Sequence, residues 1–166
     1  LTEINNLATA FADAADRAKR AGFDAIEIHG AHGYIITQFM SLFSNTRTDD
    51  YGGTLINRTR FPLEIIAAIR QQVGREYPIL FRMSVEERVD GGLTMEDSKQ
   101  IAPMLEKAGV DVIHISMGNY ASIQFVIPPV DLPVAFNVEN SAAIKQTVSI
   151  PVITAGRIND PILAEN

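Results

Sequence analysis

The sequence contains no cysteine, and that absence excludes several kinds of protein. Without thiols, these 166 residues can form no disulfide framework, no thiolate metal site and no iron–sulfur cluster. No apolar run approaches the roughly 18–20 residues that cross a bilayer, and no secretory signal peptide opens the chain. We therefore expect a cytoplasmic protein with no membrane partner and no metal site. The chain begins at Leu1 without an initiator Met, which predicts a fragment or a processed chain.

Positive charge is also scarce. Fourteen Lys and Arg residues face twenty Asp and Glu residues, and the formal net charge is −6. Because nucleic-acid binders concentrate Lys and Arg on one face, we expect no nucleic-acid partner. The hydrophobic content of 46% is ordinary for a globular protein, and 166 residues are enough for one domain that buries a core. We interpret residues 1–166 as a single domain.

Helical and extended patterns alternate along the chain. Apolar residues at helical spacing predict helices over residues 3–21 and 57–75, between Thr94 and Gly109, near 139–148, and from Asp160–Pro161 onward. Short apolar runs predict strands at residues 23–29, 79–84, 110–116 and 151–156. Thr94 and Asp97 have the spacing of a capping box. Residues 30–53 and the proline-containing segment after residue 116 are expected to be irregular. Strands alternating with helices predict an α/β fold with a parallel sheet.

Each expected strand alternates apolar and polar side chains. One face would carry Ile26/Ile28, Ile79/Phe81, Ile113/Ile115 and Ile153/Ala155, and the other Glu27/His29, Arg82/Ser84, His114/Ser116 and Thr154/Gly156. An open sheet covered by helices on both faces would be apolar on both. A polar lining that grows toward the strand ends is instead typical of the catalytic end of a (β/α)8 barrel. The alternative that these polar residues only cap the strand ends stays open.

Four strands are half of the eight in a complete barrel. The sequence therefore predicts a partial TIM barrel of about four parallel βα units, the central-to-late part of the fold, with the N-terminal strands and the last strand absent. Such a sheet has two unpaired edges. We expect a second copy of the chain or other barrel segments to cover them.

One stretch concentrates reactive groups. The expected strand that contains Ile26 and Ile28 ends at His29, and His32 and Tyr34 follow within five residues. Glycines at positions 30 and 33 lie between these three residues. Loops at the ends of buried parallel strands are where α/β enzymes place their chemistry. We predict that these three residues bind a substrate and donate a proton.

Several spaced motifs together resemble the old yellow enzyme family of FMN-dependent NAD(P)H oxidoreductases. They are HGAHGY at 29–34, QFMS at 38–41, NTRTDDYGG at 45–53 and NRTRF at 57–61. The resemblance continues through Arg82, residues 91–92 and 108–111, and PVI…GRI at 151–158, so it covers nearly the whole chain. Residues 127–129 and 158–161 look more like the 2-enoate and 2,4-dienoyl-CoA reductase branch.

The resemblance implies a role for each matching position. His29 and His32 would bind the carbonyl or carboxyl oxygen of the substrate, and Tyr34 would donate a proton to the carbon alpha to that group. Tyr120, in the loop after the third strand, is assigned to substrate binding. The implied reaction is the reduction of an activated C=C bond of an enone or enoate, a small molecule, with NAD(P)H as the electron donor.

The resemblance also implies an FMN site. Arg82 would lie near the pyrimidine edge of the flavin, and Gly156 and Arg157 would take part of the phosphate. The alternative for Arg82 is a salt bridge with Glu27, whose side chain should project from the same face. A 4Fe-4S cluster of this branch would lie beyond the C-terminal end of the chain.

Some features depart from the family pattern. The dienoyl-CoA reductases have a histidine in the loop after the third strand, where this chain has Gly118, Asn119 and Tyr120. That difference argues against a dienoyl-CoA substrate. Two other readings stay open: a flavin-free phosphate-binding aldolase or isomerase barrel, and a non-catalytic half-barrel that oligomerises. A Schiff-base aldolase needs a lysine inside the barrel, yet all four lysines are expected on helices.

Overall fold

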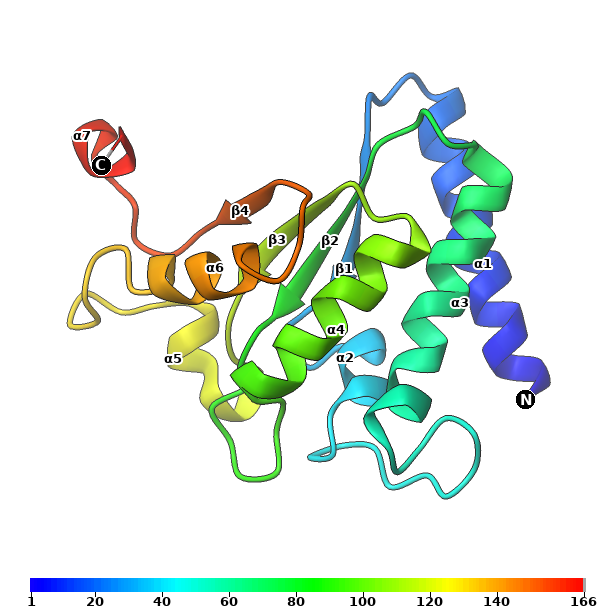
Figure 1. Ribbon diagram of the computed structural model, residues 1–166, viewed down its shortest axis with the longest axis horizontal. Helices are drawn as coiled ribbons and strands as arrows, with labels where there is room; N and C mark the ends of the chain where they lie inside the picture. The colour runs from blue at the N-terminus through cyan, green and yellow to red at the C-terminus, as the bar shows by residue number, and fades with distance from the viewer. Residues whose placement is uncertain (166) are drawn as a thin grey trace.

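The computed structural model describes residues 1–165, in which one parallel sheet is covered by a layer of helices (Figure 1). The elements in chain order are α1 (Thr2–Arg20), β1 (Ile26–Gly30), α2 (Ile35–Met40), α3 (Leu55–Val73), β2 (Ile79–Ser84), α4 (Met95–Ala108), β3 (Val112–Ser116), η1 (Tyr120–Ser122), α5 (Ile123–Val126), α6 (Val138–Lys145), β4 (Val152–Thr154) and α7 (Pro161–Glu165). None of these helices is long and apolar enough to span a bilayer.

The order of the strands identifies the architecture. All four are parallel, and their order in the sheet, β1-β2-β3-β4, is their order in the chain. The helices α1, α3, α4 and α6 pack successively against one another on one side of the sheet (Figure 1). A doubly wound fold would reverse its strand order and place helices on both faces. Crossovers that always proceed in one direction give a barrel instead, so the predicted partial (β/α)8 barrel is confirmed.

The core lies between the sheet and these helices. Phe81 of β2 and Ile113 of β3 are fully buried there, and α3 contributes Phe61, Ile65 and Ile66. The predicted apolar face is confirmed for the first three strands. The opposite face, the barrel-interior face, carries a row in which His29, Arg82 and His114 lie abreast, with Ser84 paired to Ser116 one step further along.

The predicted faces of the fourth strand are wrong. Val152 pairs with Ile113 and Thr154 with Ile115, so these two residues face the helices. Ile153 pairs with His114 on the barrel-interior face and is 40% exposed. The physical reason is that β4 is a three-residue strand at the edge of the sheet. In such a strand the apolar Ile153 need not be the residue that packs in the core.

Three short helices were not predicted. α2 lies inside the segment expected to be irregular, and η1 and α5 lie inside the proline-containing segment. Each is shorter than the two turns over which an apolar period becomes visible. The first strand also begins later than predicted, because Phe23 is exposed and pairing begins at Ile26. The capping box is confirmed: the hydroxyl of Thr94 accepts from the Asp97 N–H, and the Asp97 carboxylate accepts from the Thr94 N–H.

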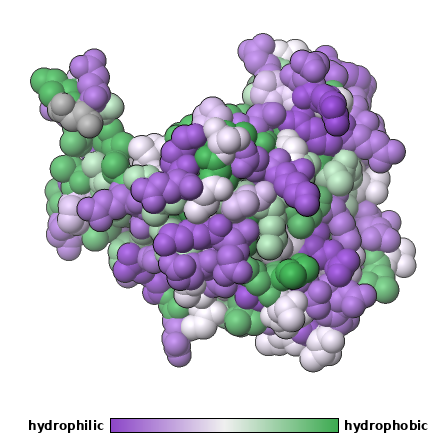
Figure 2. All heavy atoms as spheres, in the orientation of Figure 1, coloured by the Kyte–Doolittle hydropathy of each residue, from purple (hydrophilic) through white to green (hydrophobic). Residues whose placement is uncertain are grey.

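The surface of the helix layer is mostly hydrophilic, as Figure 2 shows. Hydrophobic side chains gather on the left of that view, around α7 and the segment between α5 and α6. The most exposed of them are Ile127, Val130 and Ile162.

Candidate active site

The end of β1 and the turn after it form the framework of the site. Gly30 closes the strand, and a Cβ there would fall 2.3 Å from Cζ of Phe81, so no side chain fits without moving that buried ring. His32 and Gly33 both have positive φ, 64° and 78°. Two consecutive left-handed residues reverse the chain sharply. The reversal places Tyr34 at the N-cap of α2, directly beside the strand end.

This turn brings the three predicted side chains together. The ring centroids of His29 and His32 are 5.1 Å apart, and those of His29 and Tyr34 are 5.2 Å apart. His29 comes from the strand itself, His32 from the turn and Tyr34 from the start of the helix. One short segment therefore delivers two imidazoles and a phenol to a single point.

His32 is fixed from both ends. Its backbone N–H donates to the Ser84 hydroxyl at 3.0 Å, and its ring Nε2 lies 2.6 Å from the Ser116 hydroxyl. These serines end β2 and β3, so the neighbouring strands hold the imidazole. Burial lowers the pKa of His32 to about 4, and the charge of Arg82 acts in the same direction. His32 is therefore neutral at neutral pH.

His29 is half-buried, and its pKa is also lowered. Burial is the largest cause, followed by the positive charge of Arg82, while the Glu27 carboxylate opposes them. Both imidazoles thus favour the neutral form, in which one ring nitrogen donates and the other accepts. They can offer hydrogen bonds to an oxygen without adding a positive charge to the site.

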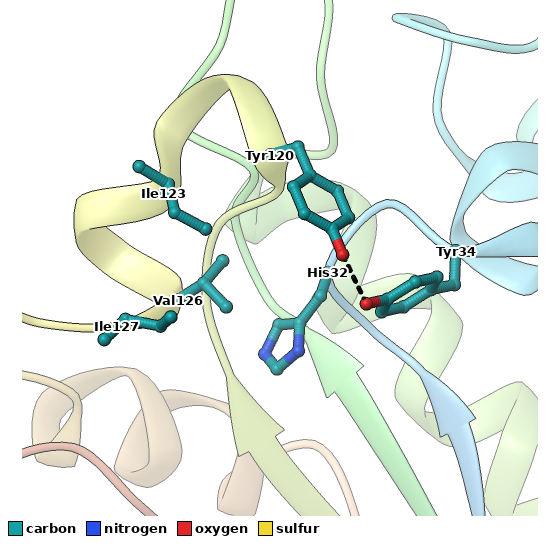
Figure 3. A pocket seen from close by; sticks show the side chains of 6 residues that line it. All are labelled: His32, Tyr34, Tyr120, Ile123, Val126 and Ile127. Carbon is teal, nitrogen blue, oxygen red and sulfur yellow. Dashed lines mark hydrogen bonds between the residues drawn. The ribbon is translucent and has the colours of Figure 1, made fainter.

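Tyr34 meets a second tyrosine across the site. Its hydroxyl lies 2.5 Å from that of Tyr120, and the two rings make an edge-to-face contact with centroids 5.7 Å apart. Figure 3 shows the two hydroxyls pointing at each other beside the His32 ring. The hydrogen bond to Tyr120 raises the pKa of Tyr34 above its usual value. Because Tyr120 begins η1, the loop after β3 supplies the second wall.

An apolar surface completes this cavity of about 130 Å³. Besides His32 and the two tyrosines, α5 lines it with Ile123, Val126 and Ile127 (Figure 3). The polar hydrogen-bonding groups and the apolar groups therefore lie on opposite sides of one hollow. Such a cavity suits a small ligand with one oxygen-bearing end and one apolar end.

The three residues assigned to a cofactor line a second cavity. Arg82, Gly156 and Arg157 share a hollow of about 240 Å³ with Ser116 and Asn137, among others. Val126 lines both cavities, so they are neighbours. The guanidinium of Arg157 donates to the Val130 carbonyl at 2.7 Å. Gly156 leaves room for Phe136, because a Cβ there would lie 2.6 Å from Cε1 of that ring.

Arg82 does not form the alternative salt bridge with Glu27. The Glu27 carboxylate instead contacts Nδ1 of His114 at 2.8 Å, on the strand beyond Arg82. A terminal nitrogen of Arg82 lies 3.4 Å from the Ser116 hydroxyl. Its Nε is buried and, within residues 1–165, has no hydrogen-bond partner. A buried donor without a partner is unusual and indicates a site for an acceptor.

The sequence interpretation missed one residue, Glu87. This carboxylate lies in the loop after β2, is 1% exposed, and accepts hydrogen bonds from Leu93 of its own loop and from the loops that carry Ser41 and Asn119. The available signal was its position just after a parallel strand, the same rule that identified His29. Glu86 precedes it with the same chemistry, so the sequence could not say which carboxylate turns inward.

Other chemistries find less support in the described residues. Residues 1–165 contain no group of three or more acidic, histidine or cysteine side chains arranged to hold a metal ion. The lysines Lys19, Lys99, Lys107 and Lys145 lie on α1, α4 and α6, outside the sheet, as predicted. A Schiff-base lysine inside the barrel is therefore not found in this part of the chain.

Comparisons with known proteins extend the assignment. The sequence matches the NADH:flavin oxidoreductase / NADH oxidase family over residues 1–166. It is 52% identical over 165 residues to an NADH oxidase of Thermoanaerobacter brockii, and 35% identical over 179 residues to a cinnamate reductase of Clostridium sporogenes. Each alignment covers 99% of this chain but only 25% and 27% of those proteins.

A solved structure agrees with these matches. The complex of 2-naphthoyl-CoA reductase with 2-naphthoyl-CoA superposes with a TM-score of 0.91 at 32% identity, over 98% of this chain and 25% of that one. The present chain thus spans about a quarter of the length of each of these three proteins. The strand order, the loop motifs and the match over all 166 residues agree, and the chain belongs to the NADH:flavin oxidoreductase / NADH oxidase family, the old yellow enzyme family that its motifs resemble.

Proposed function

We propose that this chain is part of an FMN-dependent NAD(P)H oxidoreductase that reduces a C=C bond conjugated to a carbonyl or carboxyl group. The observation that carries the proposal is the grouping of two neutral imidazoles and a phenol at the end of one strand. The named activities of relatives support it, because a cinnamate reductase reduces an unsaturated acid.

The residues around the second cavity fit a flavin. FMN offers ring acceptors and a phosphate, and the buried Nε of Arg82 is a donor that has no partner within residues 1–165. Arg82 would contact the ring, and Gly156 and Arg157 would contact the phosphate. When bound and reduced, FMN supplies a hydride. The adjoining cavity beside Tyr34 would hold the substrate.

The chain's own residues would perform the remaining chemistry. His29 and His32 donate hydrogen bonds to the substrate oxygen, where negative charge increases as the double bond is attacked. Ser84 and Ser116 hold His32 in place for this purpose. Tyr34 donates the proton to the carbon alpha to the carbonyl, as a positioned general acid. Tyr120 lies against the substrate and shares a hydrogen bond with the Tyr34 hydroxyl.

The apolar side of the cavity indicates the rest of the substrate. Ile123, Val126 and Ile127 would contact an apolar group on the far side of the double bond. Aromatic rings are such groups, and two relatives, a cinnamate reductase and a 2-naphthoyl-CoA reductase, are named after substrates that contain them. We therefore propose an enone or enoate with an apolar, ring-sized substituent.

The test uses the full-length protein loaded with FMN. Reduction of the flavin by NAD(P)H and its reoxidation by a cinnamate-type substrate are followed separately in a stopped-flow spectrophotometer. Tyr34→Phe should slow reoxidation by roughly 10²-fold or more and leave flavin reduction nearly unchanged. Only the reoxidation by substrate needs the proton that Tyr34 donates.

The matched control is Tyr51→Phe, which removes a hydroxyl that contacts Glu64 away from the cavity. It should leave both rates unchanged. An equal loss of both half-reactions in Tyr34→Phe would contradict the proton-donor role. A full-length protein that does not retain FMN would contradict the proposed function itself.

A further inference from the structure

Glu87 is a buried carboxylate that the proposed chemistry does not use. Its side chain accepts from the Ser41 hydroxyl, from the Leu93 N–H at 2.9 Å and from the Asn119 side-chain amide at 3.0 Å. No Lys, Arg or His side chain within residues 1–165 forms an ion pair with it. Three donors converge on a group that, when ionised, is only an acceptor. The site thus matches the hydrogen-bonding capacity of an ionised carboxylate.

The three donors belong to three different loops. Ser41 follows β1 and α2, Leu93 lies between β2 and α4, and Asn119 follows β3. The backbone of Glu87 adds two more bonds, from its N–H to the Leu93 carbonyl at 3.0 Å and from the Ser122 hydroxyl to its own carbonyl at 2.5 Å. One residue therefore joins the loops that follow three adjacent strands.

Each outer loop held in this way carries one of the two tyrosines. Ser41 is the C-cap of α2, a helix of only six residues whose N-cap is Tyr34. Asn119 directly precedes Tyr120, and its side-chain oxygen accepts from the Ala121 N–H at 2.9 Å, which fixes the start of η1. The two loops also touch, since a Cβ on Gly33 would lie 3.1 Å from Cβ of Asn119.

We propose that Glu87 is a positioning residue that sets the distance between the Tyr34 and Tyr120 hydroxyls and thereby aims the proton donor at the substrate. The effect of Glu87 on catalysis rests on the proposed function. Its effect on the distance between the two tyrosine hydroxyls does not. Removing the carboxylate would leave three buried donors without a common acceptor. The loops after β1 and β3 would then separate, and the two tyrosines with them.

The variant Glu87→Gln tests the proposal in the full-length, FMN-loaded protein. Glutamine keeps the size of the side chain, but its NH₂ group carries two hydrogen-bond donors. These would face the donors of Ser41, Leu93 or Asn119 in place of an acceptor. We expect the reoxidation of reduced flavin by a cinnamate-type substrate to fall roughly 10- to 100-fold, the usual effect of a displaced catalytic group. Flavin reduction by NAD(P)H should change less than twofold.

A second readout requires no turnover. The phenol of Tyr34 is titrated by near-ultraviolet absorption, as the difference between each protein and the same protein carrying Tyr34→Phe. In Glu87→Gln the pKa of Tyr34 should fall toward its usual value, because the hydrogen bond to Tyr120 is lost. The same shift is expected in Asn119→Ala, which keeps Glu87 and removes only one of its links. That variant serves if Glu87→Gln does not fold.

The matched control is Glu86→Gln. In the parent protein the Glu86 carboxylate pairs with Arg88 and does not join the loops. Both half-reactions and the Tyr34 titration should be unchanged in this variant. An unchanged Tyr34 titration in both Glu87→Gln and Asn119→Ala would overturn the proposal, as would an equal loss of the two half-reactions. If the parent protein reduces no alkene, the proposed function fails, and the titration alone decides the role of Glu87.

Discussion

At the scale of single residues, the state of the imidazoles decides what the site can do. The pKa values of His29 and His32 are both lowered, chiefly by burial and in part by the positive charge of Arg82. A neutral imidazole binds an oxygen through a directional hydrogen bond and not through a net positive charge. The arrangement suits an oxygen that is uncharged on arrival and gains charge only during the reaction.

The burial of His32 predicts how stability depends on pH. The imidazole has a pKa of about 4 in the folded chain and about 6.5 in the unfolded chain, so between these values only the unfolded chain binds the proton. This contribution to the free energy of unfolding is complete above pH 6.5 and is lost as the pH falls to 4. It should amount to roughly 3 kcal/mol at most.

Urea unfolding at several pH values between 7.5 and 4 measures the effect, with His32→Gln as the comparison. The difference in unfolding free energy between the two proteins should shrink as the pH falls. Parallel curves would show that His32 titrates normally.

Ala substitutions at two glycines distinguish the cost of backbone strain from the cost of a steric contact. Gly33 and Gly91 both have positive φ, 78° and 71°, but a Cβ on Gly33 would approach Asn119, whereas one on Gly91 would meet nothing within 4 Å. Each Ala substitution should cost about 1 kcal/mol of unfolding free energy from backbone strain. Gly33→Ala should cost more and should also slow alkene reduction, because it pushes Asn119 away. Equal losses of stability and full activity in both variants would show that the loops after β1 and β3 can move apart without consequence.

The grouping of His29, His32 and Tyr34 could be predicted because a single segment carries all three. The position of Glu87 could not be predicted, because its partners lie on three loops. The failure of the Glu27–Arg82 interpretation has a similar origin. Side-chain alternation says which face a residue occupies, but it does not say whether Arg82 or His114 on that face contacts the Glu27 carboxylate.

At the scale of elements, the end of the sheet opposite the site is held by Arg70 of α3. Its guanidinium donates to the Gly109 carbonyl at 2.6 and 2.8 Å and to the Tyr77 carbonyl at 2.6 Å, and it pairs with Asp111. These partners precede β2 and β3. One side chain thus connects a helix with the beginnings of two strands.

Arg70→Lys should therefore be costly although the charge is kept. An ammonium group cannot reproduce the planar fork that serves several carbonyls at once. We expect a loss of about 2 kcal/mol, measured by denaturant unfolding. Arg75→Lys, at an exposed position nearby, should change stability by less than about 0.5 kcal/mol. Similar values for the two variants would mean that the fork contributes little.

Elements of three turns or more were predicted from their periods, and α1, α3 and α4 lie where the apolar spacing put them. The short elements depend on tertiary contacts. α2 exists because Ile36, Thr37 and Met40 are buried against the rest of the chain, and no local signal encodes that burial. The wrong face assigned to β4 has the same cause, since its register is set by Ile113 and Ile115 on the neighbouring strand.

At the scale of the whole molecule, the barrel-interior face is uncovered in this part of the chain. Ile153 is 40% exposed on it, and β1 and β4 each pair on one side only within residues 1–165. We expect a polypeptide of these 166 residues alone to associate with itself through this face and these edges.

Sedimentation velocity over a hundredfold range of concentration tests the expectation. Species larger than the 18.2 kDa monomer should grow with concentration, and Ile153→Lys should weaken their formation. The matched control is Ile162→Lys, an exposed position on α7. A monomer at every concentration would contradict the expectation.

The order of the strands has one further consequence, for the exchange of backbone amide hydrogens with deuterium. Amides of β2 and β3 are bonded on both sides and should exchange slowest. About half of the amides in β1 and β4 point away from the one strand that pairs with them within residues 1–165, and these amides should exchange quickly in the 166-residue polypeptide. In the full-length protein, further strands of the barrel would bond to those same amides. Deuterium uptake at β1 and β4, set against that at β2 and β3, therefore reports barrel closure without any substrate or cofactor.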